Sequence, residues 1–211
     1  MLSLRELVAA VPDAMLRGGD VTIKAVRYDS RQVQPGDLFV AIAGARADGH
    51  HYLRQALSAG AAALAVEAGR RDAWQELEGR CPLAILPDTR KGLSPLAAAF
   101  YAFPARRLKV IGITGTDGKT SLAHLTAHLL KTAGLQAGNI STIGCEIAGI
   151  PLLEFDSRFT TPEAPEVHAM LARMVESGCS HAVVESTSHG LALHRLDDCE
   201  YDIAAVTNVG A

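Results

Sequence analysis

The sequence predicts an α/β protein in two parts: a small N-terminal α/β domain, and a second domain with a mostly parallel sheet. Short apolar runs alternate with segments of helical composition along the chain, which is typical of strands joined by helices. A glycine-rich turn at 112–120 stands between a strong strand pattern and a helix pattern. The composition changes in between, so we expect domains at 1–88 and 108–211 with a linker at 89–107.

In the first part, a short amphipathic helix is expected within 2–8, and Gly60 ends a helix pattern at 51–58. The segment 61–67 suits either a strand or a helix end. Ser94 and Pro95 indicate the start of a helix that runs to about Tyr101, because proline is favoured in a first turn. Strand patterns occupy 21–28, 38–43 and 81–86.

In the second part, strand and helix patterns alternate, which implies a mostly parallel sheet. Helices are expected at 119–133 and 163–177, each followed by a glycine. Strand patterns occupy 108–114, 136–143, 146–151, 181–185 and 201–207.

Charge and cysteine content limit the function classes. The net charge of −3 gives no basic field to attract nucleic acid or an anionic membrane, so local features must hold any anionic ligand. The four cysteines contain no C-x-x-C pair, which favours free thiols in a reducing compartment. No secretory signal and no apolar run of membrane-spanning length is present, so we expect a cytoplasmic protein.

The segment from Gly112 to Thr120 has the composition of a phosphate loop. Its glycines let backbone N–H groups converge on phosphate oxygens, and a helix N-terminus adds favourable partial charge. Lys119 would then contact the β- and γ-phosphates, and the Thr120 hydroxyl would bind Mg²⁺. The match to G-x-x-x-x-G-K-[ST] is imperfect, because Ile113 stands where the first glycine belongs. An ordinary glycine-rich turn with an exposed lysine remains the alternative.

Residues 114–120, TGTDGKT, resemble the TGTNGKT loop of Mur ligases and folylpolyglutamate synthetases. Asp117 replaces the usual asparagine and places a negative charge near the triphosphate. The resemblance implies ATP as the nucleotide and Mg²⁺ as the metal. The residues implied in nucleotide binding are Gly115, Thr116, Asp117, Gly118, Lys119, Thr120 and Ser121.

Three segments of the first part, YDSR, PGDLFVA and ADGH, occur in the order found in the N-terminal domain shared by MurE and MurF ligases. That domain holds the uridine nucleotide. The resemblance implies that Ser30 contacts the UDP group and that a loop at Gly44, Ala45 and Arg46 approaches uracil or pyrophosphate. By residue chemistry alone, these segments are common turns.

Two later segments resemble MurE ligases more specifically. In TTPE, Thr160 and Thr161 would contact the muramoyl group, although a threonine before a proline-started helix is also an ordinary N-cap. In VVESTSHGLALHR, Glu185 leaves a strand end and would help to hold Mg²⁺. The resemblance implies that Thr187, Ser188 and Arg195 line the UDP-muramoyl-peptide site. The alternative is that this segment is a capped helix start followed by a solvent-facing arginine.

The resemblance implies an ATP-dependent acid–amino-acid ligase of peptidoglycan precursor synthesis. The carboxylate of UDP-MurNAc-L-Ala-D-Glu is phosphorylated, and an amino acid, diaminopimelate or lysine, attacks the acyl phosphate. Catalysis would rest on Lys119 and Glu185, with Mg²⁺ on Thr120 and Glu185. No nucleic acid or membrane partner is expected.

The chain ends in TNVGA, where the family continues into a DHLD-like segment, a lysine and a third domain. We therefore expect a truncated central ATPase domain and an inactive fragment that lacks its C-terminal part. Other Mur-family ligases, of MurF or folylpolyglutamate type, fit the STSH and DSR segments less well. A non-catalytic nucleotide- or UDP-sugar-binding module remains open, as do the amino acid and the oligomeric state. His124 and His128 lack the H-E-x-x-H pattern, and we expect a packed or exposed pair rather than a metal site.

Overall fold

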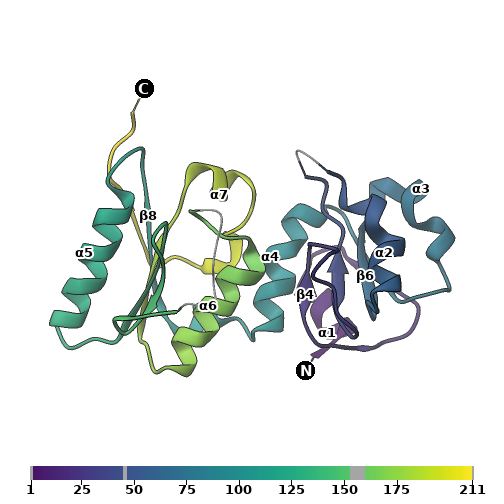
Figure 1. The fold of residues 1–211 in the computed structure, drawn as a ribbon, viewed down its shortest axis with the longest axis horizontal. Coiled ribbons are helices and arrows are strands. Elements are labelled where there is room, and N and C mark those ends of the chain that lie inside the picture. Colours follow the sequence, from purple (N-terminus) through teal and green to yellow (C-terminus); the bar gives the residue numbers. More distant parts are fainter. Residues whose placement is uncertain (1, 45–46, 153–159, 211) are drawn as a thin grey trace. The chain divides into compact units, whose positions relative to one another are not determined.

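A computed structural model describes residues 2–44, 47–152 and 160–210 and divides the chain into two compact units, Met1–Phe100 and Tyr101–Ala211. Both combine helices with a sheet, which confirms the predicted α/β class (Figure 1). The division falls within the linker expected at 89–107. In the part of the chain that is described, no helix is long and apolar enough to cross a membrane.

The first unit contains a five-stranded sheet in the order β2-β7-β6-β5-β4. Neighbouring strands are parallel, except that β2 runs antiparallel to β7 at one edge. A separate ribbon pairs β1 (Leu2–Ser3) with β3 (Thr22–Ile23), so the strand pattern at 21–28 is divided between two sheets. The strands of the larger sheet are β2 (Met15–Arg17), β4 (Val26–Arg27), β5 (Leu38–Val40), β6 (Ala63–Glu67) and β7 (Leu83–Leu86).

Alternating side chains of this sheet pack against helices. Phe39 and Leu64 face a cluster that includes Trp74, and the three side chains are almost fully buried. On helix α4, Leu93 and Leu96 are buried as well. The helices are α1 (Leu4–Val8), α2 (Leu53–Ser58), α3 (Arg71–Trp74) and α4 (Thr89–Phe100), with 3₁₀ turns η1 (Gly49–Tyr52), η2 (Ala68–Arg70) and η3 (Gln75–Leu77).

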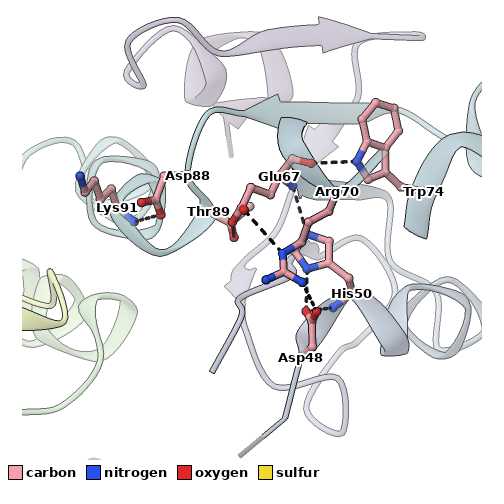
Figure 2. Close-up of polar contacts among 8 residues, drawn as sticks. All are labelled: Asp48, His50, Glu67, Arg70, Trp74, Asp88, Thr89 and Lys91. Carbon is pink, nitrogen blue, oxygen red and sulfur yellow. Dashed lines mark hydrogen bonds and ion pairs between the residues drawn. The ribbon is translucent and has the colours of Figure 1, made fainter. Parts of the chain in front are cut away.

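Helix α4 begins five residues earlier than the sequence pattern indicates. The carboxylate of Asp88 accepts a hydrogen bond from the backbone N–H of Lys91 at 3.0 Å and so satisfies the first turn (Figure 2). Pro95 therefore lies inside the helix rather than at its start. A Cβ at Gly92 would overlap Leu86, so α4 packs closely on the first unit, and residues 89–100 are helix rather than linker.

The second unit contains a six-stranded sheet in the order β11-β10-β9-β12-β8-β13. The four strands β9, β12, β8 and β13 are parallel, as the alternating pattern predicts, and β10 and β11 extend the sheet as antiparallel strands. The strands are β8 (Lys109–Thr114), β9 (Ala137–Ser141), β10 (Gly144–Ile147), β11 (Ile150–Pro151), β12 (His181–Glu185) and β13 (Ile203–Val206).

Helices α5 and α6 lie on opposite faces of this sheet (Figure 1). Met170 and Leu171 of α6 pack on Val184, whereas Ala123 of α5 packs on Val183, the next residue of the same strand. Because the central strands are parallel, their carboxyl ends meet at one edge, where α/β sheets place their ligands. The remaining elements are α5 (Lys119–Thr132), α6 (Ala164–Glu176), α7 (Ser188–Ala192), η4 (Pro104–Arg107) and η5 (Asp197–Cys199).

Candidate functional site

The glycine-rich segment forms a tight loop between β8 and α5, in the strand–turn–helix arrangement that a phosphate loop requires. Gly115 and Gly118 have φ angles of 137° and 79°, which residues with a Cβ atom rarely adopt. The ammonium group of Lys119 donates hydrogen bonds of 2.8 Å to the carbonyl oxygens of Gly115 and Thr116. Lys119 therefore closes the loop on itself in this structure, while Ser121 is exposed on the first turn of α5.

The segment after β13 closes the same loop from the other side. The side-chain oxygen of Asn208 accepts hydrogen bonds from the backbone N–H groups of Thr116 and Asp117, each at 3.1 Å. The hydroxyl of Thr207 donates to the carbonyl of Asp117 at 2.6 Å, and the N–H of Gly210 donates to the hydroxyl of Thr116 at 2.8 Å. The N–H groups of Thr116 and Asp117, which could bind phosphate oxygens, thus donate to the Asn208 carboxamide in this structure.

Glu185 lies at the centre of the polar cluster, at the end of β12. The residue is 1% exposed, and its carboxylate accepts hydrogen bonds from the hydroxyl of Thr120 at 2.9 and 3.0 Å. It also accepts bonds from the backbone N–H of Thr142 at 2.9 Å and from the Thr142 hydroxyl at 3.1 Å. The ends of β9 and β12 and the start of α5 therefore converge on one buried carboxylate.

The donor set of this cluster suits Mg²⁺. A carboxylate with two hydroxyl groups offers only hard oxygen ligands, which Mg²⁺ prefers. Within the described residues, no group of three or more His, Cys, Asp or Glu side chains is arranged to hold a metal. One carboxylate together with substrate phosphates is a common way for proteins to bind Mg²⁺, so Glu185 and Thr120 fit the proposed metal site.

A second polar group connects the residues of the TTPE and STSH segments. The hydroxyl of Thr161 lies 2.9 Å from that of Thr187 and accepts a hydrogen bond from the backbone N–H of Thr187 at 3.1 Å. It also donates to the carbonyl of Glu185 at 3.3 Å. The hydroxyl of Thr187 caps helix α7 by accepting from the N–H of Gly190 at 3.0 Å. The N-cap role is thus observed at Thr187, whereas Glu163 occupies the cap position of α6.

Arg195 is buried in an ion pair rather than facing solvent. Its guanidinium lies 2.9 Å from the carboxylate of Glu163 and donates a 2.9 Å hydrogen bond to the carbonyl of Thr161, and the side chain is 8% exposed. The guanidinium therefore holds the TTPE segment in place. Among the other implied substrate residues, Thr160 is partly buried and Ser188 is exposed at the start of α7.

In the first unit, Ser30 is partly exposed, and its hydroxyl lies 3.5 Å from the side-chain oxygen of Gln55. Beside it, hydrogen bonds from Arg31 hold the pKa of the Asp29 carboxyl below its usual value. Gly44 is exposed, and its N–H donates to the carbonyl of Ala47 at 3.0 Å. Ala45 and Arg46, which the resemblance places near the uracil or pyrophosphate of the UDP substrate, lie outside the described residues.

A buried histidine anchors the chain just after that loop (Figure 2). The Nε2 atom of His50 accepts a hydrogen bond from the backbone N–H of Glu67 at 3.1 Å. The ring proton therefore lies on Nδ1, which donates to the carboxylate of Asp48 at 2.8 Å. Arg70 pairs with the same Asp48 carboxylate. Burial raises the pKa of Asp48, but hydrogen bonds from His50 outweigh this effect, and the pKa lies below its usual value.

The sequence patterns did not identify Thr142, Asn208 or the contact between His124 and Ser141. The imidazole Nε2 of His124 lies 3.0 Å from the hydroxyl of Ser141, so this histidine is packed beside the site. A usable signal was nevertheless present, because Ser141, Thr142 and Asn208 all lie at or just beyond the carboxyl ends of predicted parallel strands.

Comparison with known families matches both parts of the chain. Residues 113–211 match the family described as Mur ligase middle domain, and residues 22–101 match the one described as Mur ligase family, catalytic domain. The first match contains the phosphate loop and Glu185. The second contains Ser30 and the Asp48–His50 anchor.

Similar curated proteins carry consistent names. UDP-N-acetylmuramyl-tripeptide synthetases from Roseiflexus sp. and Deinococcus radiodurans are 49% and 42% identical over 89% and 91% of this chain. A UDP-N-acetylmuramoyl-L-alanyl-D-glutamate–2,6-diaminopimelate ligase from Bacillus licheniformis is 40% identical over 90% of it. The chain spans 36%, 38% and 37% of the length of these three relatives.

Solved structures of Mur ligases also resemble this chain. A UDP-N-acetylmuramoyl-L-alanyl-D-glutamate–2,6-diaminopimelate ligase matches 89% of this chain and 37% of its own, with a TM-score of 0.68 at 25% identity. MurF from Acinetobacter baumannii matches 98% of this chain and 40% of its own, with a TM-score of 0.66, and at 21% identity that likeness shows the fold alone. The chain belongs to the Mur ligase family and spans N-terminal and middle-domain sequence of that family, with tripeptide synthetases of the MurE type among its relatives.

Proposed function

We propose that the polypeptide carrying this chain is an ATP-dependent ligase that adds the third residue, diaminopimelate or lysine, to UDP-MurNAc-L-Ala-D-Glu. The observation that carries the proposal is the contact between Thr120, at the head of the phosphate loop, and the buried carboxylate of Glu185. This contact joins a phosphate-binding loop to a hard-cation ligand. The names of the relatives that are 40–49% identical supply the substrate class.

ATP would bind over the loop 115–118 and the N-terminus of α5, where backbone N–H groups and the helix dipole favour phosphate. Lys119 would exchange its two carbonyl partners for phosphate oxygens and stabilise the charge that develops on the transferred phosphoryl group. Mg²⁺, bound by Thr120 and Glu185, would supply electrostatic stabilisation of the phosphates. Asp117 is exposed in this loop and would reduce the local positive potential.

Residues of each unit are proposed to bind a part of the sugar-peptide substrate. Ser30, Gly44, Ala45 and Arg46 are proposed for the UDP group. In the second unit, Thr160, Thr161, Thr187 and Ser188 are proposed for the muramoyl peptide. Because Arg195 is buried against Glu163, we assign it a positioning role, in which it holds the backbone of Thr161.

The proposed reaction has two steps. The terminal carboxylate of the substrate attacks the γ-phosphorus of ATP, giving an acyl phosphate and ADP. The amine of the incoming amino acid attacks the acyl carbon, a peptide bond forms, and phosphate leaves with the electron pair of the broken C–O bond. Binding of the uridine end contributes remote binding energy that holds the carboxylate in position for phosphorylation.

The test uses the polypeptide that the gene encodes, with ATP, Mg²⁺ and UDP-MurNAc-L-Ala-D-Glu. Meso-diaminopimelate or L-lysine is added separately, and ADP release is measured together with the mass of the uridine product. We expect one of the two amino acids to give equal amounts of ADP and UDP-MurNAc-tripeptide. Activity only with UDP-MurNAc-tripeptide and D-Ala-D-Ala would instead indicate a MurF-type ligase.

A matched pair of variants controls for folding. Thr120→Val removes the hydroxyl proposed for Mg²⁺, whereas Thr126→Val makes the same change further along the same helix. We expect turnover to fall about 100-fold in the first variant, within the range of losses from single transition-state contacts, and to be unchanged in the second. Nucleotide binding without turnover under any of these conditions would favour the non-catalytic binding module.

A further inference from the structure

A cavity of about 280 Å³ lies in the second unit, between α5 and the β9–β10 part of the sheet. One wall is a single face of the helix, formed by His124, Ala127, His128 and Lys131, and the other comes from β9, β10 and the turn at Gly149. None of its lining residues has a role in the proposed ligase reaction. Its volume is just below the usual range of small-molecule sites, about 300–1,000 Å³, so only a small ligand would fit.

Asn139 lines this cavity with a buried, unpaired carboxamide. The residue is 2% exposed, and neither its side-chain nitrogen nor its oxygen has a hydrogen-bond partner among the described residues. A buried polar group without a partner destabilises the folded state, so a partner for this carboxamide would be favourable. Both atoms are almost fully shielded from contact, so a ligand that donates and accepts would bind them once the carboxamide turns toward the cavity.

Lys131 and Glu146, which carry opposite charges, line the same cavity without forming an ion pair with each other among the described residues. Glu146 is the direct cross-strand partner of Asn139 in the β9–β10 pair, so both side chains stand on the same face of the sheet. A Cβ at Gly149 would overlap the ammonium group of Lys131 and lie 3.5 Å from Glu146 Oε1. No ion pair joins Lys131 to Glu146 within the described part of the chain, although both groups reach this point. The missing side chain at Gly149 leaves room for both.

We propose that this cavity binds a free α-amino acid as its zwitterion. The ligand carboxylate would pair with Lys131 and its ammonium group with Glu146, and a turn of the Asn139 carboxamide toward the cavity would let its nitrogen donate to the carboxylate and its oxygen accept from the ammonium group. An inorganic anion would leave Glu146 and the Asn139 oxygen unsatisfied, and a divalent cation would be repelled by Lys131. This assignment rests on the cavity alone and is independent of the ligase proposal.

The contact between His124 and Ser141 connects the cavity to the carboxylate site. Ser141 precedes Thr142, whose N–H and hydroxyl bind Glu185. A ligand beside His124 therefore lies next to the strand end that supports the proposed metal ligand.

The experiment titrates the ¹⁵N-labelled chain with glycine, L-alanine, L-glutamate and L-lysine and follows the side-chain amide signals of Asn139 by NMR. Acetate and methylamine serve as the two halves of the zwitterion. We expect a saturable shift with at least one amino acid at concentrations up to about 10 mM, and binding about tenfold weaker, or absent, with each half alone.

Variants test the two charged anchors. Lys131→Met and Glu146→Gln are each expected to weaken binding at least tenfold, whereas Lys91→Met, on an exposed face of α4, leaves it unchanged. The proposal is overturned if a folded chain shows no saturable shift with any of the four amino acids, which would leave only water in the cavity. Equal binding of acetate, or unchanged binding in both anchor variants, would also overturn it.

Discussion

The carboxamide oxygen of Asn208 accepts the backbone N–H of Thr116 at 3.1 Å, across 92 residues of sequence. The same oxygen accepts the N–H of Asp117. Both donors belong to the loop proposed to hold phosphates, so Asn208 and a bound nucleotide would compete for them. Lys119 is likewise engaged with loop carbonyls. Two N–H groups of the loop and the Lys119 ammonium group are thus engaged within the protein, and a phosphate that binds these groups must displace their present partners.

Removing the competing carboxamide is therefore expected to strengthen nucleotide binding. In Asn208→Ala, the dissociation constant for ADP, measured by calorimetry, should fall about threefold to tenfold, the equivalent of one typical net hydrogen bond. Weaker binding in this variant would mean that Asn208 instead holds the loop in a conformation ready for phosphate. If neither the wild type nor the variant binds ADP, the nucleotide assignment itself is wrong.

Glu185→Gln should abolish the effect of Mg²⁺ on nucleotide binding. The neutral amide keeps the size of the side chain but removes the charge that a hard cation requires. We expect the wild type to bind ATP more tightly in Mg²⁺ than in EDTA, and the variant to bind it equally in both. Glu176→Gln, at an exposed position on α6, is the control and should keep the wild-type ratio. A Mg²⁺ effect retained in Glu185→Gln would remove Glu185 from the metal site.

The Arg195–Glu163 ion pair should matter for stability more than its surface counterpart on α6. Arg195→Met removes the positive partner of a buried carboxylate and is expected to lower the free energy of unfolding by about 3–5 kcal/mol in urea titrations. Arg173→Met breaks the exposed pair with Glu176 and should cost less than about 1 kcal/mol. The double change of Arg195 and Glu163 should cost less than the sum of the single changes. A small effect of Arg195→Met would contradict the positioning role.

His168 predicts a dependence of stability on pH. Burial lowers the pKa of His168 from 6.5 to about 4. Above pH 6.5 the imidazole is neutral in both the folded and the unfolded state, so it adds no slope. Between pH 6.5 and 4 the unfolded state binds a proton that the folded state does not. The free energy of unfolding therefore decreases by up to about 3 kcal/mol as the pH is lowered from 6.5 to 4.

Unfolding titrations at several pH values measure this slope. His168→Leu should reduce the loss of unfolding free energy between pH 6.5 and 4. His51→Leu, at an exposed position, should keep the wild-type dependence of stability on pH. Identical profiles in all three proteins would show that His168 is not the group responsible.

Local patterns were sufficient for most of the fold. The strand at His181–Glu185 and the helix from Lys119 follow the predicted segments closely, because apolar periodicity and glycine stops act over a few residues. The short edge strand Met15–Arg17 was missed because three residues carry no readable period. Helix α4 was misplaced at its start because proline at a first turn was preferred over the Asp88 cap.

The sequence by itself determined the α/β class, the position of the phosphate loop and the identity of Lys119, Thr120 and Glu185 as candidates, since these depend on neighbours along the chain. Only the tertiary structure decided that Thr142 and Asn208 join them, because parallel strands bring distant carboxyl ends to one edge. It also decided that Arg195 is a buried partner of Glu163 rather than an exposed ligand, because burial depends on how the elements pack and not on residue type.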